Sequence, residues 1–338
     1  MSGWKLALSL LVGMVALVGG TVAFVFLMYA NQPAGTQPRE VRIQIEPGMT
    51  LRQVSGLLAR KRVIGNPTTF SLYTVLKGRQ SQIQAGEYQL SPTLKPEEIL
   101  HKLVTGDTVV YTLTIPEGYR LSEIAGLLES RGLADAERFR QAVRDPQFLQ
   151  AFGLSGGTLE GYLFPDTYQF RKRPTETELV RIMTDTFRRR AMKPEYLERA
   201  RELGFSFHQI VTLASLIEKE TGRPEERPLI SAVFHNRLKR KMKLQTDPTV
   251  IYALAHFDGN IRKKDLSVDS PYNTYRYRGL PPGPIASPGL ESIHAALYPA
   301  DSQALYFVSR QDGSHHFSTS LEEHNRAVLQ YQIKPAKG

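Results

Sequence analysis

The 338-residue chain contains no cysteine. This absence excludes disulfide bonds, cysteine-ligated zinc, iron–sulfur clusters and a cysteine nucleophile. It leaves the compartment open, because an oxidising space permits disulfides without requiring them. The chain also lacks the GxxxxGK[ST], GxGxxG, HExxH and GxSxG signatures, and its eight histidines have no carboxylate-rich ligand set at metal-binding spacing. We therefore expect neither a metal nor a cofactor.

Acidic residues are outnumbered: 33 Asp and Glu stand against 43 Lys and Arg, which gives a formal net charge of +10. The hydrophobic share of 41% excludes a wholly disordered chain, and the length predicts two or three domains. The basic excess favours a polyanionic partner, which could be nucleic acid, anionic lipid or an acidic wall polymer. Charge alone does not choose among these three.

One long hydrophobic run is present. Residues 6–30 carry no charge and exceed the roughly 20 residues that a helix needs to cross a bilayer. A cleavable signal peptide has a shorter apolar region and a small-x-small cleavage site, neither of which is clear here. Lys5 precedes the run, and residues 31–37 after it are uncharged, so the positive-inside tendency places the N-terminus in the cytoplasm. A buried core helix would show a similar pattern.

We therefore expect a single-pass protein of the cell inner (plasma) membrane, with a cytoplasmic tail at 1–5 and all residues after 30 exported. An exported chain rarely meets nucleic acid, so we expect no nucleic-acid partner. The basic clusters at 188–190 and 237–243 are then predicted to be solvated helix faces.

A pattern of strand, tight turn and two helices occurs twice, since residues 45–64 align with 115–134 at an offset of 70. The first copy closes with a return strand, which is hard to find in the second. The first copy resembles the small glycan-binding LysM module, although a structural spacer would have the same pattern. The expected organisation is α+β, with a linker at 31–39, a LysM-like module at 40–107, a second LysM-like or connecting unit at 108–150 and a catalytic domain at 151–335.

The most informative helix is predicted over residues 207–220. Glu218 lies within its apolar face, where lost hydration would raise the carboxyl pKa and suit a general acid. Glu220 lies on the neighbouring stripe and is a second candidate. A helix-terminal carboxylate paired with an arginine would look the same.

Two polar segments follow that helix. Asp247 precedes a proline, which is typical of a turn or N-cap residue. The segment 270–289 could form the wall of a carbohydrate groove or an ordinary surface loop, and its aromatic and amide side chains include Tyr272, Asn273, Tyr275 and Tyr277.

Taken together, five ordered motifs resemble the endolytic murein transglycosylase family, often called MltG or YceG-like. They are LASLIEKET (213–221), FHNRL (234–238), LQTDPTVIYAL (244–254), YNTYRYRGLPPGPIASPG (272–289) and YFVSR…HHFSTSLEEHN (306–325). The resemblance implies cleavage of peptidoglycan strands between N-acetylmuramic acid and N-acetylglucosamine, leaving 1,6-anhydro ends. It also implies that Glu218, the first glutamate of EKET, is the catalytic residue.

Such a lyase needs no second catalytic carboxylate, because the muramic acid C6 hydroxyl attacks its own anomeric carbon. Gln245, Asn273 and Tyr275 are then expected to stabilise the transition state, while Asp247 and Glu220 contribute charge or orient their neighbours.

Two other functions remain open: a wall-binding scaffold that cleaves nothing, and a muramidase that hydrolyses the strand with Asp247 as second carboxylate. The expected partners are peptidoglycan strands, the membrane and the synthases of wall elongation, where cleavage would terminate strand growth.

Overall fold

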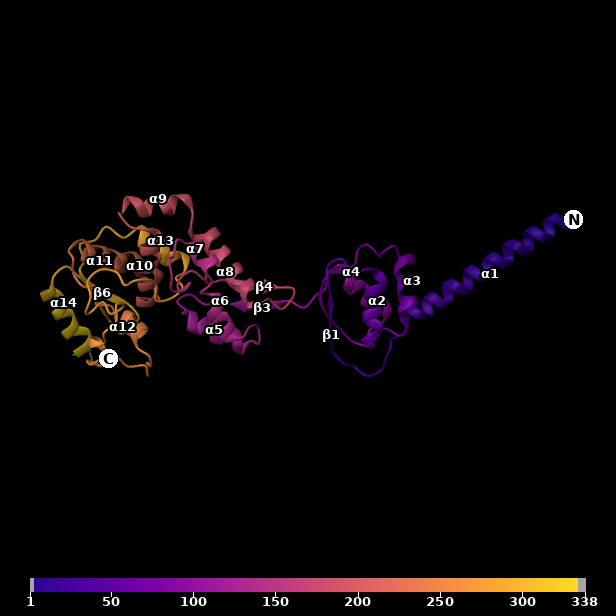
Figure 1. The fold of residues 1–338 in the computed structure, drawn as a ribbon, viewed down its shortest axis with the longest axis horizontal. Helices are drawn as coiled ribbons and strands as arrows, with labels where there is room; N and C mark the ends of the chain where they lie inside the picture. The colour runs from indigo at the N-terminus through magenta and orange to yellow at the C-terminus, as the bar shows by residue number, and fades with distance from the viewer. Residues whose placement is uncertain (1–2, 334–338) are drawn as a thin grey trace. The chain divides into compact units, whose positions relative to one another are not determined.

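The computed structural model describes residues 3–333, which form two compact units. Unit 1 comprises the chain up to residue 112 together with 169–173, and unit 2 comprises 113–168 together with the chain from 174 onward. Helices and small sheets are combined in the chain, so the predicted α+β class is confirmed (Figure 1).

The elements follow one another along the chain as labelled in Figure 1. The α-helices are α1 (Gly3–Asn31), α2 (Leu51–Arg60), α3 (Pro67–Leu76), α4 (Pro96–Thr105), α5 (Leu121–Ser130), α6 (Ala136–Ala142), α7 (Pro146–Gln150), α8 (Glu176–Ala191), α9 (Pro194–Glu202), α10 (Phe207–Glu220), α11 (Arg227–Lys239), α12 (Asp247–Ala253), α13 (Leu290–Leu297) and α14 (Leu321–Val328). The strands are β1 (Val41–Ile45), β2 (Gly86–Leu90), β3 (Tyr111–Thr114), β4 (Thr167–Phe170), β5 (Tyr306–Ser309) and β6 (His315–Ser318). Short 3₁₀ turns occupy Pro224–Glu226 and Asp265–Ser267, and a π turn occupies Leu329–Ile333.

Helix α1 is 29 residues long, and its segment Leu10–Asn31 is long and apolar enough to cross a membrane. Its C-terminal end packs against unit 1, to which it belongs: Ala30 is buried in the unit's core. The rings of Phe26 and Tyr29 lie 6.3 and 6.1 Å, centroid to centroid, from that of Tyr73 on α3. The end of the apolar helix is therefore fixed to the small unit that follows it.

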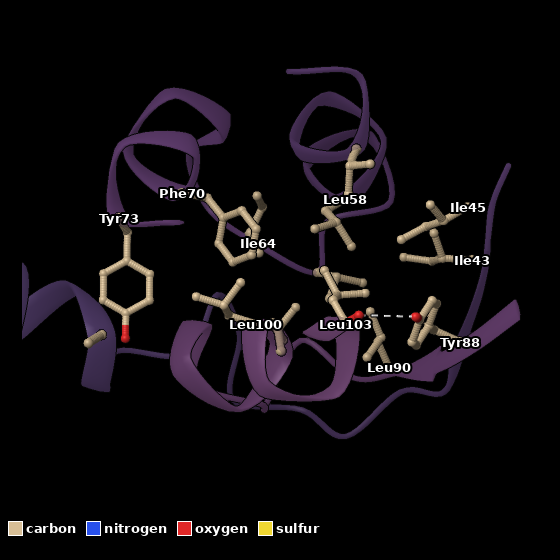
Figure 2. Packing of buried hydrophobic residues seen from close by; sticks show 14 residues of the cluster. Ile43, Ile45, Leu58, Ile64, Phe70, Tyr73, Tyr88, Leu90, Leu100 and Leu103 are labelled. Atoms are coloured by element: carbon tan, nitrogen blue, oxygen red, sulfur yellow. Dashed lines mark hydrogen bonds between the residues drawn. The ribbon is translucent and has the colours of Figure 1, made fainter. Parts of the chain in front are cut away.

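The core of unit 1 lies between the paired strands β1 and β2 and the helices α2, α3 and α4 (Figure 2). The strands are antiparallel, and Ile43 pairs with Tyr88 at their centre. Alternation along both strands turns Ile43, Ile45, Tyr88 and Leu90 inward. The Tyr88 hydroxyl donates to the carbonyl oxygen of Gln84 at 2.8 Å, and the carbonyl oxygen of Leu103 lies 3.3 Å from it as a second acceptor.

The helices of unit 1 begin where the sequence supplies caps. Thr50 and Gln53 form a capping box at the start of α2, and the Asn66 side chain accepts two backbone N–H groups at the start of α3, where Pro67 is the first helical residue. Gly106 ends α4 in the left-handed conformation, with φ 69°.

The predicted sequence repeat is present in the structure. Helix α5 lies 70 residues after α2 at both of its ends, and β3 is followed by α5 and α6 as β1 is followed by α2 and α3. The return strand that is hard to find in the sequence is β4, which pairs with β3. It was obscured because α7 and an irregular segment separate it from α6. Glycan binding by either copy, of the kind that a LysM module shows, stays a prediction.

Unit 2 is built around α10, which packs against α13, α11, α9 and α12. The β5–β6 hairpin is antiparallel, with Phe307 opposite Phe317, and α14 packs against both of its strands. The strand-like run ALYFVSR (304–310) contains β5, and only the end of the similar run YLFPDTY (162–168) belongs to β4.

Leu58 and Leu72 make a matched pair for testing this packing. The Leu58 side chain is fully buried, whereas Leu72 is 51% exposed. Leu58→Ala should lower the free energy of unfolding of unit 1 by about 2–5 kcal/mol, because it removes contacts and leaves a cavity. Leu72→Ala should change it by less than about 0.5 kcal/mol. Native-state hydrogen exchange of peptides from unit 1 measures both, and equal losses would contradict the assigned core.

Candidate active site

Helix α10 positions both glutamates of the EKET motif. Ser206 caps it, accepting the Gln209 N–H at 3.2 Å within a capping box. The eight consecutive residues from Ile210 to Ile217 are buried, so neighbouring elements surround the helix. After this buried run, polar side chains are again partly accessible in the last turn, which carries Glu218 and Glu220.

The Glu218 carboxylate is 6% exposed and already has partners at both oxygens. Its Oε1 lies 3.4 Å from Nη2 of Arg227, whose side chain is 9% exposed, and its Oε2 accepts the backbone N–H of Gly289 at 2.9 Å. The sequence allowed for a helix-terminal glutamate paired with an arginine, and Glu218 has this geometry.

Glu117 extends the cluster around Glu218. Its Oε2 lies 3.7 Å from Arg227 Nη2, and burial, followed by the charge of Glu218, raises the pKa of the Glu117 carboxyl. The Glu117 carboxylate lies so close over Gly289 that a Cβ there would stand 2.0 Å from its Oε1. A larger residue at 289 would therefore displace the Glu117 side chain from its present position.

Glu220, the last residue of α10, lies at a different place, on the wall of a polar cavity of about 530 Å³. The cavity is lined from α10, α11, the segment before α12, the 270–289 loop, β5–β6 and the C-terminal helix. Its lining residues are Glu220, Arg237, Leu244, Gln245, Asp247, Tyr275, Tyr306, Phe307, Val308, Ser309, His315, Leu321, His324, Asn325, Val328 and Gln332.

The environment of Glu220 favours a protonated carboxyl near neutral pH. Burial, and after it the charge of Asp247, raise the pKa of Glu220 from 4.5 to about 7. A hydrogen bond from the Thr246 hydroxyl and the positive charge of Arg237 act in the opposite direction without cancelling the effect. A carboxyl with a pKa near the working pH can both give and take a proton.

Three of the predicted site residues meet Glu220 at this cavity: Gln245, Asp247 and Tyr275. The Tyr275 hydroxyl donates to Asp247 Oδ1 at 2.6 Å. Gln245 has the left-handed φ of 51°, a strained conformation for a residue with a side chain. Asp247 is the first residue of α12, whose N-cap is Thr246.

Asn273 is also buried, but it is not among the residues that line the cavity. Its side-chain N–H groups donate to the carbonyls of Leu266 and Val268, and its Oδ1 accepts the N–H of Tyr275. These bonds shape the loop that presents Tyr275. A direct contact between Asn273 and a substrate stays a prediction.

Sequence reasoning missed Arg237, because the basic segment 237–243 was predicted to be a solvated face. Arg237 is instead buried and donates to the carbonyls of Leu305 and Leu244, at 2.6 and 2.7 Å. Its guanidinium carbon lies 5.1 Å from the ring centroid of Tyr306. The periodicity of α11 was the signal available, since Arg237 lies four residues after the buried Val233.

His315 was also missed. Its Nδ1 lies 2.6 Å from Glu226 Oε2, and its backbone N–H donates to Glu226 Oε1 at 2.8 Å. These bonds hold the imidazole at the cavity wall and lower the pKa of Glu226, whose burial acts in the opposite direction. The HHF segment that contains His315 belongs to the last of the five motifs.

A sequence model of the YceG-like family matches residues 43–330. The chain belongs to the YceG-like family. Among YceG-like relatives, the "Endolytic murein transglycosylase" of Bacillus subtilis (strain 168) is 34% identical over 86% of this chain and 84% of its own length. The protein of that name from Streptococcus pneumoniae serotype 2 is 30% identical over 93% of this chain, which spans 62% of that relative.

A solved YceG-like structure is similar as well. The 2.6 Å crystal structure of a yceG-like protein from Listeria monocytogenes is 36% identical and superposes with a TM-score of 0.60. The match covers 85% of this chain and 98% of that chain.

The raised pKa of Glu220 predicts a pH-dependent stability. Between pH 4.5 and about 7 the folded protein keeps a proton that the unfolded chain has released, so its free energy of unfolding should fall as pH rises through this interval. Glu220→Gln should flatten this decline and exceed the wild type in stability at pH 8. Urea denaturation at several pH values measures the difference.

Glu160 provides an internal control, because burial raises its pKa to about 7 as well. Its contribution is common to both proteins and cancels in their difference. An unchanged slope in Glu220→Gln would contradict the protonated state assigned to Glu220.

Proposed function

We propose that this chain is a membrane-anchored endolytic murein transglycosylase that cuts peptidoglycan strands between N-acetylmuramic acid and N-acetylglucosamine and leaves 1,6-anhydro ends. The single observation that carries the proposal is a protonatable glutamate on the wall of a polar cavity. The names of the relatives supply the reaction class, and the matched family model covers most of the chain.

We propose Glu220 as the acid and base, although the sequence favoured Glu218. Glu220 lines the cavity, and the pKa of its carboxyl lies near neutral pH. Glu218 is bound by an arginine and a backbone N–H, and it does not line the cavity. The catalytic assignment of Glu218 stays a prediction, and the experiment below separates the two.

The proposed reaction has two proton transfers and consumes no water. The Glu220 carboxyl gives its proton to the glycosidic oxygen as the C1–O bond breaks, which leaves an oxocarbenium-like muramoyl centre. The Glu220 carboxylate then takes the proton of the muramoyl C6 hydroxyl while that oxygen bonds to C1. The carboxyl returns to its starting state, and the product carries a 1,6-anhydro ring.

The neighbours of Glu220 have supporting roles in this proposal. The Asp247 carboxylate, fixed by the Tyr275 hydroxyl, places negative charge beside Glu220 and so helps to keep it protonated before the first step. The same charge stabilises the positive muramoyl centre. Gln245 offers an amide from its strained position on the cavity wall.

We also propose that α1 anchors the chain in the inner (plasma) membrane, with the short tail in the cytoplasm and both units outside. The length and composition of Leu10–Asn31 support this, as does the uncharged segment that follows. At this location the enzyme would meet strands that are being synthesised, and cleavage there would end their growth. The synthases of wall elongation are the partners expected of such an enzyme.

Mass spectrometry of glycan strands digested by the full chain in detergent tests the reaction. Internal products with 1,6-anhydro ends are expected from the wild type. Glu220→Gln should lower turnover by roughly 10²–10⁴-fold, because it removes the proton donor. Reducing ends would indicate a hydrolase and implicate Asp247, whereas binding without cleavage would indicate a scaffold.

Glu218→Gln is the matched control, since it makes the same change two residues away. It should keep measurable turnover per folded molecule but lower thermal stability, because Arg227 is left without its buried partner. If turnover disappeared in Glu218→Gln and survived in Glu220→Gln, the catalytic assignment would revert to Glu218.

Extraction of membranes with alkaline carbonate tests the anchor. The full chain should stay in the membrane fraction with its N-terminal peptide intact. Replacing Leu17 and Val18 by lysine should release it, because charges at the centre of a span are costly. A mature chain that lacks the apolar segment would instead identify a cleaved signal.

A further inference from the structure

Five basic side chains surround a second cavity, in unit 1 and remote in sequence from the EKET motif. The cavity measures about 430 Å³ and lies between the start of β1 and the C-terminal end of α2. Its lining residues are Arg39, Glu40, Val41, Arg42, Arg60, Lys61 and Arg62, so five cations stand against one carboxylate.

Hydrogen bonds orient two of these side chains without neutralising them. The Arg39 guanidinium donates to the carbonyl of Lys61 at 3.1 Å, and the Arg42 guanidinium donates to the hydroxyl of Tyr111 at 3.3 Å. Within residues 3–333, none of the five cations has a carboxylate within ion-pair distance. The cavity is therefore a site of concentrated positive charge.

Arg62 is held in a backbone conformation that disfavours it. Its φ is 56°, in the left-handed region, and it follows the C-cap residue of α2. The equivalent residue of the second repeat, 70 positions later, is Gly132, with φ 63°. Glycine adopts this conformation at no steric cost, whereas an arginine does so under strain. The left-handed position after the helix is therefore a strained arginine in the first repeat, which has the basic cavity, and an unstrained glycine in the second.

The other equivalent positions of the second repeat are mostly uncharged. Residues 39, 42, 60 and 61 of the first copy correspond to Val109, Thr112, Ser130 and Arg131 of the second. The strand, turn and helix therefore form without this charge, and four of the five cations are absent from the second copy. The strained backbone of Arg62 and the restriction of the basic cluster to the first repeat both point to a bound ligand.

We infer that this basic cavity binds the phosphate headgroup of an anionic lipid. Guanidinium groups match the oxygens of a phosphate with paired hydrogen bonds. The inference rests on the proposed membrane anchor. Arg39 lies 39 − 31 = 8 residues beyond the end of α1 at Asn31, a distance of at most roughly 29 Å along an extended chain. The packing of Ala30 and Phe26 on the unit's core further limits how far the cavity can move from the bilayer.

Native mass spectrometry of the full chain in non-ionic detergent, with phosphatidylglycerol and phosphatidylcholine of equal chain length added together, tests the site. The wild type should retain phosphatidylglycerol in preference. Lys61→Gln/Arg62→Gly should lower this preference by roughly tenfold or more. The second substitution installs the residue of the other repeat, so the backbone should fold without strain.

Arg131→Gln/Arg138→Gln is the matched control, because it removes two exposed charges from the second repeat. It should retain the lipid preference of the wild type. An equal loss of lipid preference in both variants would show that the preference depends on net charge alone. Equal retention of both lipids by the wild type would exclude the site. Displacement of the lipid by millimolar inorganic phosphate at constant ionic strength would assign the cavity to free phosphate.

Glycan cleavage by the same proteins separates this inference from the proposed function. Lys61→Gln/Arg62→Gly should cut purified strands as fast as the wild type, since neither residue lines the Glu220 cavity. If the wild type cut nothing, the transglycosylase proposal would fail while the lipid measurement still stood.

Discussion

The burial of α10 is the constraint on which unit 2 depends. Eight consecutive residues of this helix are enclosed, and the elements that enclose it come from parts of the chain as far apart as α9 and α13. A helix surrounded in this way cannot rotate or slide without losing contacts on every side. Its last turn is therefore held at a fixed point, where two carboxylates two residues apart leave the helix in different directions.

Glu218 and Glu220 have different surroundings, on which the roles proposed for them rest. Glu218 meets an arginine and a backbone N–H, which suits a carboxylate that holds segments together: the start of α11 and the turn before α13. Glu220 meets a threonine hydroxyl and a neighbouring negative charge on the wall of the polar cavity, which suits a group that exchanges protons. In the proposed reaction, one short sequence would thus supply both a structural ion pair and a proton-transferring group.

Much of the fold was predictable from local signals. The helix over 207–220, the apolar N-terminal helix and the repeat at offset 70 follow from periodicity, caps and glycine positions, which act over a few residues. The candidate site was only partly predictable. Gln245, Asp247 and Tyr275 were named, and they do line one cavity with Glu220. The choice between the two glutamates depended on neighbours outside the helix, between 9 and 71 residues away, and a helical pattern contains no information about them.

The same limit explains the errors at Arg237 and at the second return strand. A run of basic residues indicates solvent exposure unless carbonyl groups from outside its helix bind one of them. The carbonyls of Leu305, 68 residues away, and of Leu244, seven residues away, bind Arg237 in this way. Strand β4 was missed because an insertion separates it from the helices of its repeat. In both cases the decisive contacts join segments that are far apart along the chain.

The cavity around Glu220 is closed on one side by β5, β6 and α14, which come after the other parts of its wall in the chain. Residues 306–332 supply more than half of its wall. During export of a nascent chain the EKET helix would reach the far side of the membrane well before this wall does. In the proposed exported topology, the site would stay incomplete until the segment up to residue 332 had crossed the membrane, so it could not act on the wall while that segment was still in the export channel.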